Sequence, residues 1–505
     1  MSFDPDMYLK GLSLAYYTDF AKIKQYFAKD YQEITLKPSK ISDDVIEVVE
    51  KYNKKIDASP YVFENIQKMK DAPIVVTGQQ PCLLTGPLYV VYKALTTIIL
   101  AEKVKGVPVF WNASEDDDVE EVNHIWVINT DLEKIRIDME DNPFFRNTVT
   151  TNQIHDVITC LKDMTPPTEY RDDILNLIPV SSMTLSELFS RILSKLFSSY
   201  GLVMVEPYIF QELAIPLYQQ LITNPVTAVD LVNAAGDSLE KGGYKRQLHK
   251  PRDNCSFYVI SDDKRYNVTF DGKFHIHDEE YTEKELLIML DEHPEMFSST
   301  VVSRPLIQDF LFQTLAYCAG PGEVSYFAQM KEVYEFFGVS EPYIVPRFGA
   351  TLVEKKVQKI LDKYRIGITD LMNPEYLVKS LARKDIQEFF DDRKGKILTL
   401  VQELENYMVS IDGNLKRTGA AIETRIQGNL KNLEERTAAA LKNQNHIMEE
   451  QIMRASQNMF PNNSLQERVL NVFQYLIRYN NLIDQLYAEF HDARPGEHVI
   501  LHPGG

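Results

Sequence analysis

Residues 74–124 read IVVTGQQPCLLTGPLYVVYKALTTIILAEKVKGVPVFWNASEDDDVEEVNH. The apolar run Ile74–Val76 predicts a strand, the apolar periodicity of Leu88–Lys103 predicts a helix, and Val107–Trp111 predicts a second strand. Polar loops follow both strands, and four acids at 115–118 come directly after the second one. Because ligands bind outside the carboxyl ends of strands in open parallel sheets, both loops should border one crevice. The stretch therefore predicts an α/β fold built on a parallel sheet.

The charge balance of the chain excludes some classes of partner. Its 505 residues carry a formal net charge of −19, from 54 basic and 73 acidic residues. This charge repels a phosphate backbone and an anionic membrane surface, so neither nucleic acid nor a membrane is an expected partner. The length predicts two or more domains.

Three further features favour a cytoplasmic protein. The first residues, Met1–Pro5, lack the basic start and apolar core of a secretory signal. The most membrane-like window, 83–100, contains Gly86, Pro87 and Lys93, which a spanning helix tolerates poorly. The 4 cysteines include no close pair of the kind that zinc or redox motifs use, so buried and unreactive thiols are expected.

The pattern along the chain predicts a core with insertions. Polar, proline-containing sequence follows Asn129, and short β-like pieces surround the Asp271-Gly272 turn. Single helices are expected over Val324–Phe337 and Leu465–Phe490. The expected organisation is a core at 1–130, 201–222 and 300–380, connecting insertions at 131–200 and 223–299, a coiled-coil hairpin at 381–460, and a C-terminal helix returning to the core at 461–505.

Residues 386–459 carry a coiled-coil pattern. Proline is absent, and apolar residues recur at three- and four-residue steps, for example from Leu404 to Ile411 and from Ile422 to Leu433. Either Asp412-Gly413 or Thr418-Gly419 could turn the chain between two antiparallel helices. The second helix would be ~50 Å long, more than a compact core needs. It should bury its stripe in its own hairpin and offer its remaining apolar surface to a second copy, giving a homodimer.

The loop after the first strand has the residues of an anion site. Gly78 and Gly86 allow close approach of a ligand to the backbone, and Gln79, Gln80 and Thr85 offer uncharged hydrogen-bonding groups just before a helix N-terminus. An anion or a nucleotide phosphate fits there, but a simple strand-to-helix turn explains the same glycines. Lys93, on the helix beyond, is expected on a solvated face.

The acid cluster has three interpretations. Ser114 and the acids after it could cap a helix and oppose its dipole. Alternatively, Glu115, Asp116 and Asp118 could grip an ammonium group or sugar hydroxyls, with one of them as general base. Binding of a divalent cation such as magnesium is the third possibility. Asn123 and His124 could face the same crevice.

Two arginines are candidates for recognising an anion. Arg304 and Arg347 lie beside prolines at predicted strand ends, where a guanidinium suits bidentate binding of a carboxylate or phosphate. Ion pairs with surface acids are the alternative. The segment Gly320–Glu323, with Tyr326 one turn later, predicts a tight helix entry in which Glu323 could be merely a first-turn acid.

Several of these segments together resemble the BshC family, the cysteine-adding enzymes of bacillithiol biosynthesis. The resemblance runs in order along most of the chain and includes the coiled coil. The segments that carry it are Thr77–Gln80 with Leu84–Tyr89, Ser114–Asp118 with Asn123-His124, Arg304–Leu306, Gly320–Glu323 with Tyr326-Phe327, and Leu465–Arg468.

The resemblance implies a fold and an activity. The fold would be a Rossmann-type parallel-sheet core similar to class I aminoacyl-tRNA synthetases, with two connecting insertions and a long antiparallel coiled coil that forms a homodimer. The activity would be a ligase that joins L-cysteine to the amine of glucosaminyl-malate. Catalytic roles would fall to Glu115, Asp116, Asp118 and His124, and substrate-binding roles to Gly78, Gln79, Gln80, Thr85, Gly86, Tyr89, Asn123, Arg304, Gly322, Glu323, Tyr326 and Arg347.

Energetics point to ATP, with magnesium, as the cofactor. Condensing a carboxylate with an amine is uphill in water, so the carboxylate of cysteine needs activation as an adenylate or an acyl phosphate. The sequence has neither a His-x-Gly-His nor a Lys-Met-Ser-Lys element in a suitable place. ATP dependence therefore rests on energetics and on analogy of fold.

Two other functions fit the same sequence. The family pattern has a histidine where this chain has Asp117, which permits a related ligase that acts on another amino sugar or amine. A nucleotide-binding scaffold whose coiled coil recruits partners is the non-enzymatic alternative.

Overall fold

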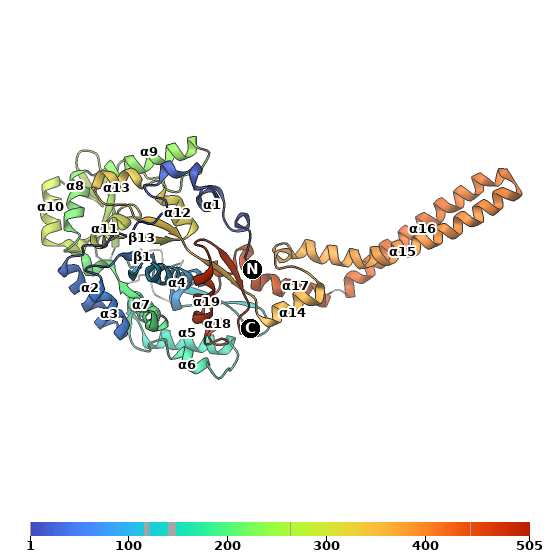
Figure 1. Cartoon of the computed structure of the whole chain (residues 1–505), viewed down its shortest axis with the longest axis horizontal. Helices are drawn as coiled ribbons and strands as arrows, with labels where there is room; N and C mark the ends of the chain where they lie inside the picture. The colour runs from blue at the N-terminus through green and yellow to red at the C-terminus, as the bar shows by residue number, and fades with distance from the viewer. Residues whose placement is uncertain are drawn as a thin grey trace. The chain divides into compact units, whose positions relative to one another are not determined.

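The computed structural model describes residues 2–115, 120, 122–139, 148–262, 264–444 and 446–504. The chain forms two compact units, one of Met1–Leu352 with Leu465–Gly505 and the other of Val353–Ser464 (Figure 1). The second unit is thus an insertion, in sequence, between two segments of the first.

A five-stranded parallel sheet is the centre of the first unit. Its strand order is β14-β13-β1-β2-β7, and every neighbouring pair is parallel. This order confirms the predicted α/β class and parallel sheet, while a likeness to class I aminoacyl-tRNA synthetases stays a prediction. The strands are β1 Ile74–Gln79, β2 Val107–Asn112, β7 Val203–Val205, β13 Ala316–Ala319 and β14 Tyr343–Pro346.

Helix α4, Leu88–Lys103, is the element expected after β1, and its bounds agree with the prediction. It packs on β1, β2 and β13, beside which it lies in Figure 1. The helices α2, Asp43–Lys55, and α3, Pro60–Lys68, contact the sheet at its edge strand β7, and α3 also contacts β2. Burial of nearly all apolar strand side chains between these layers supplies most of the driving force for this arrangement.

Two modules interrupt the sheet. The first holds the antiparallel pair β3, His124–Ile128, with β4, Lys134–Asp138, and the helices α5, Thr151–Met164, and α7, Leu185–Leu196. The second follows helices α8, Ile215–Thr223, and α9, Thr227–Lys241. It is an antiparallel sheet of order β11-β10-β9-β8-β12, with β8 Asn254–Ser261, β9 Lys264–Phe270, β10 Phe274–Ile276, β11 Glu279–Tyr281 and β12 Phe297–Ser299, and helix α10 at Glu283–Glu292.

Two helices expected from periodicity are broken in the structure. The segment predicted as Val324–Phe337 forms α12, Pro321–Phe327, and α13, Lys331–Phe337. The segment predicted as Leu465–Phe490 forms a short turn, then α18, Phe473–Leu476, and α19, Leu482–Asp492.

The physical reason for the second break is the use of backbone groups by other segments. Leu88 N–H donates to the carbonyl of Leu470, and Asn471 N–H donates to the carbonyl of Trp126. These groups are therefore not free for a helical ladder. The chain ends in β16, His498–Leu501, which pairs in parallel with β15, Gly349–Leu352.

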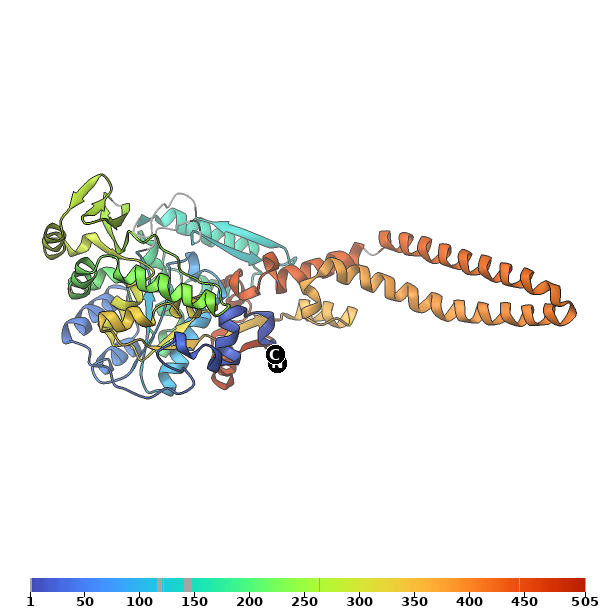
Figure 2. The same ribbon diagram turned by 90° about the horizontal axis from the view of Figure 1, so that it is seen from above.

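The second unit is a helical hairpin. Helix α15, Pro374–Ile411, turns at Asp412-Gly413 into α16, Lys416–Gln444, and α17, His446–Met459, follows. Figure 2 shows α15 and α16 side by side along the hairpin. Their close approach beside the turn occurs at Gly419, where a Cβ would lie 2.6 Å from Cγ of Glu405.

The hairpin seam differs in part from the predicted stripes. Leu404, Ile411, Ile422 and Leu433 were expected in the stripes, but their side chains are exposed. The helix pair buries only one narrow strip of each helix, so apolar residues a step away from that strip face outward. None of the helices in the described part of the chain is both long and apolar enough to cross a membrane.

Candidate functional site

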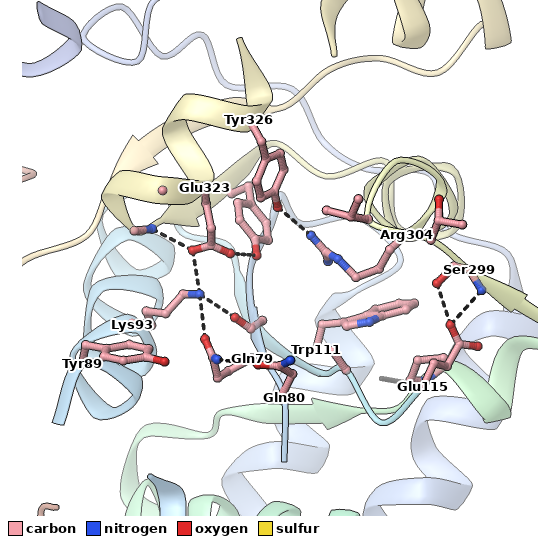
Figure 3. A pocket seen from close by; sticks show the side chains of 18 of the residues that line it. Gln79, Gln80, Tyr89, Lys93, Trp111, Glu115, Ser299, Arg304, Glu323 and Tyr326 are labelled. Carbon is pink, nitrogen blue, oxygen red and sulfur yellow. Dashed lines mark hydrogen bonds and ion pairs between the residues drawn. The ribbon is translucent and has the colours of Figure 1, made fainter. Parts of the chain in front are cut away.

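A polar cavity of about 500 Å³ lies at the carboxyl ends of the strands of the parallel sheet (Figure 3). Residues at or just beyond the carboxyl ends of all five strands line it, as expected for an open parallel sheet. Of the residues predicted from sequence, those in its wall are Gly78, Gln79, Gln80, Tyr89, Glu115, Arg304, Gly322, Glu323, Tyr326 and Arg347. The structure thus brings the two early loops and the two later arginines to one place.

Lys93 is the main residue that the sequence analysis misjudged. It was expected on a solvated face, but the residue is buried and lines the cavity. Its Nζ lies 2.6 Å from Glu323 Oε2, 2.6 Å from the carbonyl oxygen of Gly78 and 3.4 Å from Gln79 Oε1. An ammonium has three donors, so these partners use all of them. Lys93 therefore fixes the end of β1 to the start of α12.

Burial lowers the pKa of Lys93 below its ordinary value, although Glu323 acts in the opposite direction. Burial also opposes ionisation of Glu323. The charge of Lys93 and the hydrogen bonds that Glu323 accepts outweigh this effect and hold the pKa of Glu323 below its ordinary value. We therefore treat the pair as an ammonium and a carboxylate.

Glu323 binds several groups at the start of α12. Besides Lys93, it accepts hydrogen bonds from the backbone N–H of Gly320 at 2.7 Å and from the hydroxyl of Tyr317 at 2.7 Å. Glu323 is therefore also an acid of the first helical turn, as the predicted alternative states, because its hydrogen bond from Gly320 N–H caps the helix. The ion pair to Lys93 adds a contact across the cavity wall.

Arg304 differs from its predicted position. It is not at a strand end but in the first turn of α11, Ser303–Phe312. The helix begins early because Arg304 N–H donates to the carbonyl of Thr300. Its guanidinium donates to Tyr326 Oη at 3.0 Å and to Gln308 Oε1 at 3.1 Å, and it lies 5.6 Å from the ring centre of Tyr317.

Arg347 follows β14, as predicted, and is 8% exposed. Its two terminal nitrogens donate to the two carboxylate oxygens of Glu467, at 2.6 Å and 3.2 Å, and one of them also donates to the carbonyl of Phe348 at 2.8 Å. Its Nε is buried and finds no hydrogen-bond partner in the described part of the chain. This N–H, 3.7 Å from where a Cβ on Gly320 would lie, is available to a ligand.

Glu115 connects the parallel sheet to the second module. It is 8% exposed, and its Oε2 accepts hydrogen bonds from Ser299 N–H at 3.1 Å and Ser299 Oγ at 2.5 Å. The same module adds Arg265, which donates to the carbonyl of Ser299 and stacks 4.2 Å from the ring centre of Tyr258. Local sequence patterns could not reveal these residues, because they reach the cavity from a separate sheet.

The cavity is positively charged although the chain is strongly acidic. Among its described lining residues, the acids are Glu115 and Glu323, and the bases are Lys93, Lys250, Arg265, Arg304, Arg347 and Arg468. Such an excess of cations in a concave, low-dielectric wall attracts anionic ligands. The site thus favours carboxylates or phosphates.

Other predicted residues do not reach the cavity. Thr85 and Gly86 form the turn before α4, and Thr85 is fully buried there; the amide of Asn471 binds the carbonyls on either side of it. Asn123 and His124 begin the β3 hairpin, which carries them outside the wall. Burial and the nearby charge of Arg136 lower the pKa of His124. Asp116 and Asp118, like Asp117, lie outside the described residues.

The described residues contain no group of three or more His, Cys, Asp or Glu side chains suited to hold a metal ion. Three of the cysteines, Cys82, Cys255 and Cys318, are buried, and Cys160 is exposed. Burial raises the pKa of the Cys318 thiol to about 12, which makes it a poor nucleophile. The described lining of the cavity offers amides, carboxylates, phenols and cations.

Comparison with known proteins places this architecture in one family. Residues 8–348 match the family model "Bacillithiol biosynthesis BshC, N-terminal Rossmann-like domain", and residues 350–503 match "Bacillithiol biosynthesis BshC, C-terminal coiled-coil domain".

Among curated proteins, the chain is 34% identical to "Putative cysteine ligase BshC" of Salinibacter ruber, over 82% of this chain and 80% of that protein. It is 30% identical to the protein of the same name from Chlorobium phaeobacteroides, over 91% and 88% of the two chains. The relative of that name from Bacillus cytotoxicus is 27% identical over 90% of each chain. The sheet, the cavity at its edge and the helical hairpin thus come from a chain that belongs to the BshC family.

Proposed function

We propose that this protein is a ligase that joins the carboxyl group of L-cysteine to the amine of glucosaminyl-malate and so forms bacillithiol. The observation that carries the proposal is the cationic cavity at the carboxyl edge of the sheet. The malyl part of the acceptor has two carboxylates, and cysteine has one, so both substrates suit such a wall. The name of the relatives, cysteine ligase, supports the same reaction.

Different groups in the wall would bind the charged parts of the substrates. Arg304 and Arg468 would hold carboxylates. Glu115 would bind the ammonium of the acceptor and take its proton, because an amine attacks a carbonyl only in its neutral form. The two hydrogen bonds from Ser299 hold the Glu115 carboxylate in place for this role.

Gln79 would orient a polar group of the substrate. Its Oε1 accepts from Lys93, and its amide nitrogen lies 3.4 Å from Gln80 Oε1. The Lys93 contact fixes which end of the amide faces the ammonium, so Gln79 presents a donor on the opposite side. A donor there can bind the carbonyl oxygen of the cysteinyl group.

ATP is the cofactor that we propose for the reaction, because amide formation from a free carboxylate is uphill. When bound, ATP would supply the free energy that activates the carboxylate of cysteine. The cavity fits an anionic phosphate chain through the excess of cations in its described lining, with Arg347 Nε as the group to hold it. The described residues offer no ligand set for magnesium, so we derive no role for the ion.

The proposed function is tested with purified protein, L-cysteine, glucosaminyl-malate and ATP, by mass spectrometry of the new amide. Glu115→Gln keeps the shape of the side chain and removes its charge, and we expect at least about a hundredfold loss of rate for a missing general base. Glu292→Gln, at an exposed position on α10, is the matched control and should retain full activity. An unchanged rate in Glu115→Gln would remove this carboxylate from the reaction, and no product from the wild-type chain would refute the ligase assignment.

A homodimer formed by the hairpin is the second part of the proposal. On α15 the side chains of Leu400, Leu404, Tyr407 and Ile411 are 60–68% exposed and recur at intervals of four and three residues. This spacing places them on one face of the helix. An apolar stripe of this length in water is best covered by a second copy of the same stripe.

A further inference from the structure

The two arginines of the cavity are held by chemically different partners. Arg347 binds a carboxylate, Glu467, through both of its terminal nitrogens. Arg304 binds an amide oxygen, Gln308 Oε1 at 3.1 Å, and a phenol, Tyr326. A carboxylate neutralises the guanidinium it holds, whereas an amide oxygen leaves the positive charge intact. Arg304 is therefore the more strongly anion-attracting of the two.

A buried carboxylate lies directly behind this amide. Gln308 and Asp309 are 0% and 2% exposed. Gln308 Nε2 donates to Asp309 Oδ1 at 2.9 Å, and the hydroxyl of Tyr334 donates to Asp309 Oδ2. The order is thus carboxylate, amide and guanidinium, from the interior of the unit to the cavity.

This order fixes the direction of the amide. An ionised carboxylate can only accept hydrogen bonds, so Gln308 must turn its NH2 group toward Asp309 and its oxygen toward Arg304. Burial raises the pKa of Asp309 to about 6, while the hydrogen bonds from Tyr334 and Gln308 and the charge of Arg304 act in the opposite direction. The guanidinium of Arg304 has only donors, so it fixes the same direction of the amide from the other side.

We propose that Asp309 and Gln308 are positioning residues for the reaction, which hold Arg304 in place and leave its charge free for the anionic substrate. The inference rests on the proposed function, because it takes glucosaminyl-malate as that substrate. The amide acts as a spacer that transmits the fixed position of the buried carboxylate without its charge. Direct pairing with a carboxylate, as at Arg347, would place a negative charge beside the substrate carboxylates.

The test exchanges the two side chains. The double variant Gln308→Glu with Asp309→Asn preserves size, total charge and the number of hydrogen bonds, but it moves the negative charge from position 309 to the group that touches Arg304. We expect KM for glucosaminyl-malate to rise by about tenfold or more, with kcat changed by less than about threefold. The single variant Asp309→Asn, which leaves an amide at 308, should raise KM less than the exchange does.

If Asp309 had only a structural role, KM would be lower in the exchange variant than in Asp309→Asn. The exchange restores the hydrogen-bond network, so it would then repair the damage done by Asp309→Asn. An exchange variant with an unchanged KM, or one that is better than the single variant, overturns the inference. The matched control is Gln358→Glu with Asp362→Asn, because Gln358 also donates to Asp362, at 2.8 Å, on the exposed surface of α14, Lys355–Tyr364. Both exchanges should keep Tm within about 2 °C of wild type.

A binding measurement separates this inference from the proposed function. If the wild-type protein forms no amide, the proposed function fails, and the inference is decided by calorimetric titration with inorganic pyrophosphate. The exchange variant should then bind pyrophosphate about tenfold more weakly than wild type. Equal affinity, or no binding to the wild-type chain, overturns the inference as well.

Discussion

Lys93 and Glu323 form an ion pair of 2.6 Å between α4 and the start of α12, and the lysine side chain is 3% exposed. Lys93 also binds the end of β1 through Gly78, and Glu323 binds the N-cap of α12 through Gly320. Because Lys93 is buried and the Glu323 side chain is 21% exposed, water can only partly replace a partner that is removed. The pair therefore sets the shape of the cavity wall.

Lys93→Met should destabilise the fold and abolish ligase activity. It leaves the carboxylate of Glu323, whose side chain is 21% exposed, without its counter-charge, at a cost of about 2 kcal/mol. The double variant Lys93→Met with Glu323→Gln removes both charges and should recover a good part of the lost Tm, though not the activity. Thermal unfolding of the wild type, both single variants and the double variant measures the coupling. Additive losses would show that the pair contributes nothing to stability.

Arg468→Gln should weaken substrate binding without affecting stability. Arg468 lines the cavity and is exposed, and it forms no ion pair with the described part of the chain. We expect KM for the anionic acceptor to rise by about five- to tenfold, with Tm unchanged, and the wild-type KM to rise with ionic strength. Arg494→Gln, whose side chain is 85% exposed, serves as the control and should leave KM unchanged. A KM that is insensitive to salt and to Arg468 would argue against an anion site.

Leu404→Glu should dissociate the dimer. It places a charge at the centre of the exposed stripe on α15, whereas Asn406→Glu adds the same charge at an exposed position about 200° around the helix from Leu404. Light scattering after gel filtration should give monomer mass for Leu404→Glu and dimer mass for wild type and Asn406→Glu. Dimer mass in all three would exclude this stripe as the interface.

Glu341→Gln should stabilise the protein at alkaline pH. Glu341 is buried, its Oε1 finds no hydrogen-bond partner in the described chain, and burial raises its pKa from 4.5 to about 8. The folded state therefore binds more protons than the unfolded state between these values, and stability falls as pH rises across this window, by at most about 1.4 kcal/mol per pH unit.

The glutamine cannot ionise, so its variant should lose this part of the pH dependence. Thermal unfolding at pH 5 and pH 9 measures the effect, and the difference in Tm between variant and wild type should become more favourable to the variant at pH 9. Glu335→Gln, on the exposed side of α13, should follow the wild-type pH profile. Parallel profiles for Glu341→Gln and wild type would contradict the raised pKa.

The core of the fold could be predicted from local sequence because its signals are local. The apolar runs of β1 and β2 and the periodicity of α4 are each contained within one element. The break between Leu465 and Phe490 could not be predicted, because backbone groups of this segment bind distant residues such as Trp126. Periodicity records which face is apolar, and it does not record which partners compete for N–H and C=O groups.

The site was predicted where loops follow strands and missed where it depends on tertiary contacts. Gln79 ends β1, Glu115 lies three residues after β2, and Arg347 follows β14, and such positions can be read from sequence. Lys93 lies on a helix that is buried on almost every side, so its pattern does not show which face meets a ligand. Its partner Glu323 is far away in sequence, and Lys250, Tyr258 and Arg265 come from a separate module.

The bond between Arg347 and Glu467 joins residues 120 positions apart, on either side of the helical hairpin. During synthesis on the ribosome, the arginine emerges long before its counter-charge, and the hairpin must be translated between them. The wall of the cavity can therefore be completed only when the last segment of the polypeptide has been synthesised. A chain truncated within the hairpin would keep its parallel strands yet lack both Glu467 and Arg468, so translation that stops early yields no half-working ligase.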